Sequence, residues 1–294
     1  MVKQTALLDD DGSLTTVHAL VSQTQRNAQA WNDLLSASGG ALELSKCSCH
    51  ILQWKFSPQG APLLVLVHDD LQSALTVHDR QTNTTHNLQL LSTYTAHKTL
   101  GHYKAPIGNQ KEQFRQLKKK SDEITAFLWT CPLSRLEAWT YYFACYLPSV
   151  GYPLACSSMT RDQLTTIQQK AMSIIVARCG FNRNTKMEIL YGPLELGGAN
   201  FRSLYVQQGV GQVTTFIKHW RLRSTAGNLL RIALSWFQQQ TGVSYPILEQ
   251  VTTSLPHLES VWIGSLRTFL AEHDLSLQVD HSSIPKLQRQ YDSY

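Results

Sequence analysis

The sequence lacks the features that mark membrane or secreted proteins. No run of apolar residues approaches the roughly 18 that span a bilayer, and the run Leu63–Val67 has the length of a buried strand. The first residues, Met1–Thr5, lack the apolar core of a signal peptide. Six cysteines at irregular spacing in 294 residues indicate reduced thiols rather than a disulfide framework. We therefore expect an intracellular protein with no membrane partner, in the nucleus or the cytoplasm.

The usual signals of metal and catalytic sites are also missing. Cys47-x-Cys49-His50 separates its thiols by one residue, whereas structural zinc sites separate theirs by two to four and add a second pair. Gly197–Asn200 lacks the glycine spacing and final Lys-Ser/Thr of a phosphate-binding loop. No Cys–His or Ser–His pair stands out, which makes a small-molecule enzyme the weakest alternative. We predict that this chain alone binds no metal or cofactor.

The N-terminal third of the sequence indicates one helix followed by short strands. Apolar and aromatic residues over 16–37 have the spacing of an amphipathic helix, and Gly39 and Gly40 fit a left-handed C-terminal cap. From Leu44 to Leu91 the pattern is typical of strands. The clearest strands are predicted at 63–67, 74–77 and 85–90.

The central third predicts three amphipathic helices, which together make a bundle. The first runs from an N-cap at Asn109 to about Trp129, the second from Pro132 to near Pro148, and the third starts at a capping box formed by Thr160 and Gln163. The first has an apolar side, which includes Phe127, and the second has Leu136 on its apolar side. Further helices are predicted at 201–223, 229–239, 245–251 and 258–272, before a flexible polar tail. The first helix carries basic residues on its other side, namely Lys111, Arg115, Lys118, Lys119 and Lys120.

The net charge of +5 is unevenly distributed along the chain. Residues 100–235 carry 17 basic against 7 acidic side chains, whereas residues 1–99 carry 6 against 8 and residues 236–294 carry 3 against 6. A basic helical surface can serve solubility alone. Its concentration in one region favours a polyanionic partner, and nucleic acid is the first to consider. Within this region Lys218, Arg221 and Arg223 form a basic–aromatic cluster around Trp220 that can grip phosphates.

Several motifs together resemble reverse transcriptases of the non-LTR retrotransposon type. The stretch from Trp31–Leu35 through Gly39–Glu43 to Lys46-Cys47 is similar to the end of the polymerase palm, just after the catalytic Asp-Asp turn. Leu100-Gly101 lies where these enzymes have the hairpin that grips the primer strand. The segments that resemble the region after the palm are Ile167-Gln168, Gly180–Arg183 and Gly192-Pro193 with Gly197–Ala199.

The resemblance implies an α+β fold in which a partial palm-like antiparallel sheet with a preceding helix leads into a thumb-like helical bundle and further helices. It divides the chain into a palm-like part (1–101), a basic thumb-like bundle (102–180), a helical extension (181–280) and a tail (281–294). The thumb of such enzymes packs on the template–primer duplex. Residues Leu100, Gly101 and Arg183 would accordingly contact nucleic acid together with the basic residues of the bundle.

The resemblance also gives Lys46 a role as a general acid that protonates the departing pyrophosphate. An exposed lysine at the start of a strand is the alternative. Asp9-Asp10 follows leucine rather than an aromatic residue, so an acidic exposed turn is favoured over a vestige of the catalytic turn. We therefore expect no polymerase activity from the chain alone, with Mg²⁺ bound only if a missing N-terminal polymerase part completes the site.

Two further hypotheses remain open beside a reverse-transcriptase fragment. One is a non-enzymatic helical module that binds nucleic acid with steep salt dependence and no sequence preference. The other is a degenerate retroelement remnant, in which half a palm sheet leaves an unpaired edge and an unstable fold.

Overall fold

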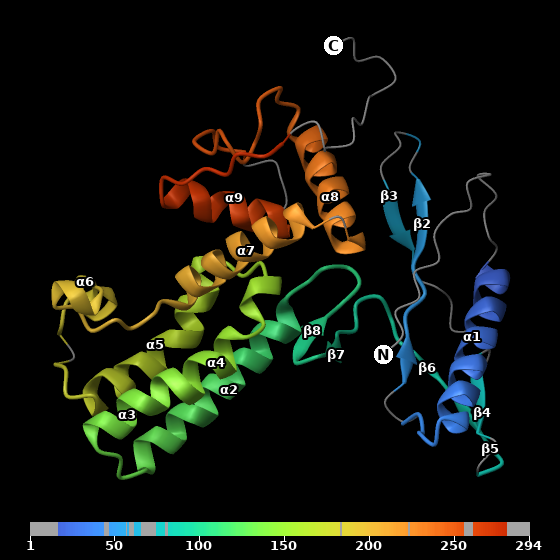
Figure 1. Cartoon of the computed structure of the whole chain (residues 1–294), viewed down its shortest axis with the longest axis horizontal. Coiled ribbons are helices and arrows are strands. Elements are labelled where there is room, and N and C mark those ends of the chain that lie inside the picture. The colour runs from blue at the N-terminus through green and yellow to red at the C-terminus, as the bar shows by residue number, and fades with distance from the viewer. Residues whose placement is uncertain are drawn as a thin grey trace. The chain divides into compact units, whose positions relative to one another are not determined.

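The computed structural model of the chain describes residues 17–43, 47–56, 58, 62–65, 75–79, 82–182, 184–222, 224–255 and 261–280 (Figure 1). It divides into two compact units, the first comprising residues 1–98 and 104–109 and the second residues 99–103 and 110–294. Helices and small sheets occur together, so the α+β class is confirmed. The predicted tail, 281–294, lies outside the described residues.

The first unit begins with the predicted helix, α1 (Val17–Ala37). Gly39 ends it with φ of 79°, a left-handed conformation that glycine adopts without a Cβ clash, and the Gly40 amide donates to the Leu35 carbonyl at 2.9 Å. Short strands follow. They are β1 (Ser48–Cys49), β2 (Gln53–Phe56), β3 (Pro62–Val65), β4 (Thr76–Asp79), β5 (Thr84–Asn87), β6 (Gln89–Leu90), β7 (His97–Thr99) and β8 (His102–Lys104).

The described strands pair only in twos, which differs from the single antiparallel sheet that we predicted. β2 pairs with β3 and β4 with β5, both antiparallel, while β1 pairs with β6 in parallel and β7 with β8. Each strand has two to four residues. Isolated two-stranded pairs are marginally stable in water. The pairs therefore depend on packing against other parts of their unit.

Two glutamines of α1 supply that packing by bonding to the backbone of β4. The Thr76 amide donates to Gln25 Oε1 at 2.7 Å, and Gln25 Nε2 donates back to the Thr76 carbonyl. The His78 amide donates to Gln29 Oε1 at 2.8 Å, and Gln29 Nε2 donates to the His78 carbonyl at 2.9 Å. The two side chains thus pair with β4 as a neighbouring strand would. A small apolar core lies beside them, made of Val21, Ile51, Leu75, Val77 and Leu88.

The second unit is helical apart from residues 99–103, which form the tip of the hairpin between β7 and β8. Its helices are α2 (Lys111–Thr130), α3 (Arg135–Tyr141), α4 (Leu147–Gly151), α5 (Arg161–Arg178), α6 (Met187–Tyr191), α7 (Leu204–Arg221), α8 (Thr225–Thr241) and α9 (Trp262–Glu272). The capping box predicted for α5 is confirmed, because the Gln163 amide donates to Thr160 Oγ1 at 3.3 Å and the Thr160 amide to Gln163 Oε1 at 3.0 Å.

The second predicted helix has different ends. It begins after Ser134, which forms a capping box with Glu137, rather than at Pro132. It also continues beyond Pro148 to Gly151, through a π-helical segment at Tyr142–Tyr146. This wider turn precedes the proline, which has no amide hydrogen to donate. The predicted end near Pro148 is therefore three residues short of the observed end at Gly151.

Three further details differ from the sequence-based prediction. Phe127 and Leu136, predicted to face inward, are 47% and 73% exposed, and Phe127 instead stacks on Tyr141 at a centroid distance of 5.4 Å. Gln110 rather than Asn109 occupies the N-cap position of α2. The helix predicted at 245–251 is only a turn, in which the amides of residues 249 and 250 both donate to the Pro246 carbonyl.

Two apolar cores meet along α7. Leu204 and Tyr205, in its first turn, belong to the core of the bundle, which also contains buried residues of α2, α4 and α5. Phe216, three turns later, belongs to a second core with residues of α8 and α9, and Val213 packs against both cores. Residues from 181 onward therefore contribute to both cores.

Buried glutamines fix α7 against the bundle. Gln168 of α5 donates to the Arg202 carbonyl at 2.7 Å and accepts from the Leu204 amide at 2.9 Å, which satisfies the backbone where α7 begins. Gln208 of α7 bonds to both the amide and the carbonyl of Met159, at 3.2 and 2.9 Å. Both glutamine side chains are buried. Because a buried unpaired amide or carbonyl costs free energy, the hydrogen bonds of these two side chains stabilise the fold.

We predict that Gln168→Ala lowers the free energy of unfolding by about 2 kcal/mol, because it leaves the buried Leu204 amide without a partner and removes one of the two hydrogen bonds to the Arg202 carbonyl. Gln169→Ala, which removes the same side chain at the exposed next position, changes it by less than about 0.5 kcal/mol. Urea unfolding of both variants measures the difference. Equal midpoints for the two variants would contradict this account.

Candidate nucleic-acid interface

One face of α2 carries exposed cations in a line. Lys111, Arg115 and Lys118 follow one another at spacings of four and three residues, which places them on one side of the helix. All three side chains are exposed, whereas Leu117 and Leu128 point into the bundle core. The first part of α2 therefore presents a basic face, defined by these three residues, to solvent.

The carboxylate of Glu112 partly neutralises the positive charge of the basic face. Arg115 donates to Glu112 Oε1 at 2.8 Å, and this hydrogen bond, with a second from Gln116, holds the pKa of Glu112 below its ordinary value. Glu112 thus remains charged at neutral pH. The pair is on the surface, where such ion pairs contribute little net free energy. A phosphate can therefore compete for the Arg115 guanidinium at low cost.

The three consecutive lysines at 118–120 point to different sides of α2. Lys119 lies beside the basic face, and its Nζ is 3.9 Å from Glu123 Oε1. Lys120 lies roughly 200° around the helix from Lys118 and donates to the Ser149 carbonyl at 3.1 Å. Lys120 is thus turned away from Lys118, and its role in binding alongside Lys118 is not supported by this geometry.

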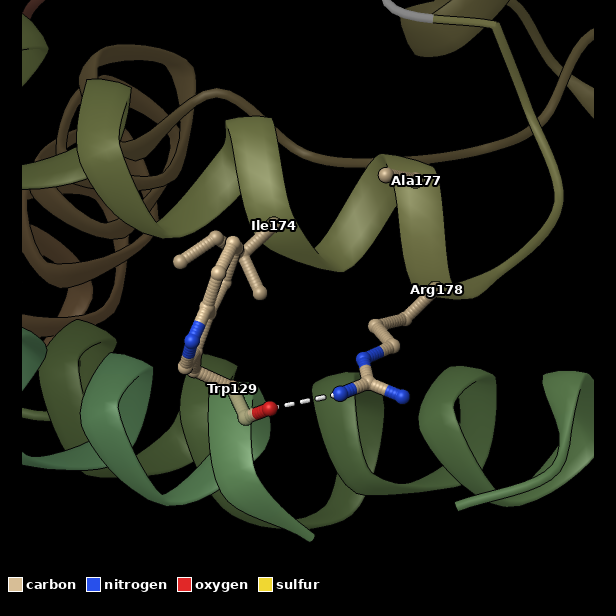
Figure 2. Close-up of a pocket in the computed structure, with 4 residues that line it drawn as sticks. All are labelled: Trp129, Ile174, Ala177 and Arg178. Atoms are coloured by element: carbon tan, nitrogen blue, oxygen red, sulfur yellow. Dashed lines mark hydrogen bonds between the residues drawn. The ribbon is translucent and has the colours of Figure 1, made fainter. Parts of the chain in front are cut away.

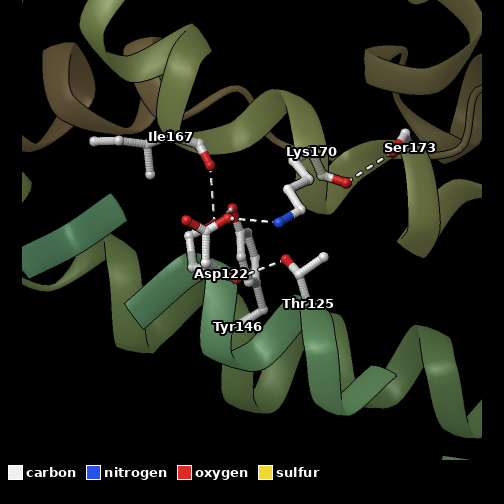
Figure 3. Close-up of polar contacts among 7 residues, drawn as sticks. Asp122, Thr125, Tyr146, Ile167, Lys170 and Ser173 are labelled. Carbon is white, nitrogen blue, oxygen red and sulfur yellow. Dashed lines mark hydrogen bonds and ion pairs between the residues drawn. The ribbon is translucent and has the colours of Figure 1, made fainter. Parts of the chain in front are cut away.

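Helix α5 is fastened along α2 by polar contacts (Figure 3). Ser121 Oγ donates to the Ile167 carbonyl at 2.9 Å and is 3.2 Å from the Tyr146 hydroxyl, and Lys170 forms an ion pair with Asp122 at 3.2 Å. Burial raises the pKa of Tyr146 to about 12, so its hydroxyl keeps its proton. These contacts hold the basic face of α2 in a fixed position relative to α5.

A pocket of about 410 Å³ lies near the C-terminal ends of α2 and α5 (Figure 2). It is lined by Trp129 from α2 and by Ile174, Ala177 and Arg178 from α5. The Arg178 guanidinium donates to the Trp129 carbonyl at 2.6 Å, while the indole ring rises from α2 towards Ile174. This pocket was not predicted from the sequence, although Trp129 follows Lys118 by three helical turns and so lies on the same side of α2.

The hairpin predicted at Leu100-Gly101 is present between β7 and β8. Both residues have positive φ, 49° and 83°, as a two-residue turn with the twist of a hairpin requires. Leu100 is 83% exposed at the tip. A Cβ on Gly101 would lie 3.4 Å from the ring of Tyr152, which is close to an ordinary contact, so the positive φ rather than lack of space favours glycine there. Contact of this hairpin with a primer strand stays a prediction.

In the basic–aromatic cluster at the end of α7, the cations are exposed to solvent but the ring of Trp220 is not free to bind a ligand. Lys218 and Arg221 are exposed in the last turn of the helix. Trp220, however, stacks on Phe216 at 5.3 Å and is covered by the Arg231 guanidinium at 5.2 Å. Its ring is therefore engaged within the protein. The predictions on Lys46, Arg183, Arg223 and the pair Asp9-Asp10 also fall outside the described residues.

The aromatic cluster around Trp139 packs within the bundle. The Trp139 ring lies 4.9 Å from that of Phe143 and 5.1 Å from that of Phe201, and Tyr142 is fully buried with its hydroxyl donating to the Arg202 carbonyl. Aromatic pairs at such distances add to the free energy of packing. These rings therefore serve core packing rather than base stacking.

In the described part of the chain, no group of three or more His, Cys, Asp or Glu side chains is arranged to hold a metal ion. Nor does any helix in that part combine the length and apolar character needed to cross a bilayer.

Comparisons with known proteins add no relative. No protein-family model matches the chain, and neither a curated protein nor a solved structure is significantly similar to it. The resemblance to reverse transcriptases therefore rests on the sequence motifs alone.

We predict that Trp139→Ala lowers the free energy of unfolding by about 3 kcal/mol, because the ring contacts Phe143 and Phe201. The control Trp129→Ala removes an indole that is 60% exposed and costs less than about 1 kcal/mol. Thermal or urea unfolding gives both values. A Trp139 variant of unchanged stability that loses binding to nucleic acid would show that the ring is a contact surface instead.

Proposed function

We propose that this chain binds the backbone of a nucleic-acid duplex through the basic face of α2, in the way expected of a reverse-transcriptase thumb. The observation that carries the proposal is the alignment of Lys111, Arg115 and Lys118 on one exposed side of a well-packed helix. The motif resemblance and the basic charge of residues 100–235 point to the same partner.

The spacing of these cations suits a phosphate backbone. Seven residues of α-helix span about 10 Å, which is the axial rise of about three nucleotides in one strand. Lysine and arginine side chains on such a helix neutralise phosphates and release counterions. Contacts of this kind position a duplex without reading its sequence. We therefore expect binding that is steeply dependent on salt and indifferent to sequence.

A template–primer hybrid is the preferred duplex because of the motif resemblance. Catalysis is not part of the proposal for the chain alone. The exposed Lys218 and Arg221 at the end of α7 are further candidates for phosphate contact, but α2 offers three aligned cations against two here.

The test is the binding of an RNA–DNA hybrid measured across a salt series, for the wild-type chain and for Lys111→Gln/Lys118→Gln. Each lost phosphate contact reduces the slope of log K against log salt by about one, so we expect the slope to fall by about two. Fluorescence anisotropy with a labelled hybrid gives the slopes.

The matched control is Lys186→Gln/Arg202→Gln, which removes the same charge from two exposed positions away from α2. We expect its slope to stay within about half a unit of the wild-type slope. If both double variants reduce the slope equally, the interaction follows net charge alone and the assignment to α2 is wrong. No binding of the wild type at low salt would contradict the proposed function itself.

A further inference from the structure

We infer that the pocket formed by Trp129, Ile174, Ala177 and Arg178 holds one unpaired nucleobase at the end of the bound duplex. The inference rests on the proposed function, since the same helix that carries the basic face also carries the pocket. It adds a binding site of defined chemistry to a surface that otherwise contacts only phosphates.

The position of the pocket follows from helix geometry. Trp129 comes 18 residues after Lys111, which is five full turns, so both residues lie on the same side of α2 and about 27 Å apart along its axis. Between them, the ion pair of Asp122 with Lys170 joins α2 to α5. A strand that lies on the basic face and continues along α2 would therefore reach the pocket.

The walls of the pocket suit a flat aromatic ring. The indole of Trp129 is 60% exposed and bounds one side, while the Arg178 side chain comes down from α5 on the other (Figure 2). Ile174 and Ala177 add apolar surface between them. The volume of about 410 Å³ falls within the range of small-molecule sites. Both an indole and a guanidinium plane stack on nucleobases.

Electrostatics favour a base over a phosphate at this position. Both α2 and α5 end beside the pocket, at Thr130 and Arg178, and the C-terminal end of a helix carries partial negative charge. The Arg178 guanidinium is already hydrogen-bonded to the Trp129 carbonyl. A phosphate would meet these carbonyl dipoles, whereas a neutral base with exocyclic amino groups would donate hydrogen bonds to them.

The base has to be unpaired to use this pocket. Inside a duplex both faces of a base are covered by its neighbours, so the ring is not available to stack on Trp129. A base in a single-stranded overhang can be splayed out and stacked on an aromatic side chain. The expected ligand is therefore the first unpaired nucleotide next to the duplex.

The experiment compares a blunt RNA–DNA hybrid with the same hybrid carrying a one-nucleotide overhang of 2-aminopurine. Two overhangs, one at each polarity, are tested. We expect one of them to bind roughly five-fold to one-hundred-fold more tightly than the blunt hybrid, with a fall in 2-aminopurine fluorescence as the base stacks. Trp129→Ala removes the stacking surface, and Ala177→Leu fills the pocket while leaving the indole in place. Both variants should bind the overhang hybrid no better than the blunt one.

Trp236→Ala is the control, because it removes a tryptophan of similar exposure from α8 and should leave the preference for the overhang intact. If the blunt hybrid binds with steep salt dependence but neither overhang adds affinity, the pocket inference is wrong and the proposed function stands. An overhang effect that survives both pocket variants would also overturn the inference. If no hybrid binds, the proposed function fails and the pocket inference fails with it.

Discussion

Glutamine side chains that bond to backbone groups hold this chain together at the points where regular structure stops. In the first unit, Gln25 and Gln29 of α1 pair with the edge of β4. In the second, Gln168 and Gln208 join α5, α7 and the segment before α5. A primary amide carries one acceptor and two donors, so it can satisfy an amide and a carbonyl of the same segment at once. Short strands and loops thereby obtain partners that the small sheets do not supply.

The glutamine contacts affect the candidate site because one of them fixes α5, the helix that packs against α2. Helix α5 is fixed to the start of α7 by Gln168 and to α2 by Ser121 and Asp122. The position of Arg178 relative to the basic face is therefore supported by contacts made earlier on the same helix. A rigid pair of helices allows several weak phosphate contacts to act together, because little conformational entropy is lost when a rigid surface binds.

The sequence predicted the helices that have strong periodicity and local caps. Helix α1 and its glycine cap, the capping box at Thr160, and the basic side of α2 all follow from spacing within a few turns. The start of α3 was predicted wrongly because it was placed at Pro132, whereas the capping box of Ser134 with Glu137 starts the helix two residues later. Lys120 was assigned to the basic face although helical spacing alone places it elsewhere.

Features that depend on distant residues were not predictable in this way. The pairing of β1 with β6 in parallel joins residues about 41 positions apart, and no local pattern specifies it. The pocket joins Trp129 to Arg178, which lie 49 positions apart. Likewise the glutamines were missed, since a polar residue in an amphipathic helix is normally expected on its solvent side. Burial and tertiary contact decide these cases.

The most direct test of the account is lysine footprinting, in which the protein is acetylated with and without a saturating RNA–DNA hybrid and each lysine is quantified by mass spectrometry. The account predicts that the hybrid protects Lys111 and Lys118 on the basic face, while Lys120 on the other side of the same helix and Lys186 outside it react as before. Equal protection of Lys118 and Lys120, or protection of Lys186 with none on α2, would contradict it.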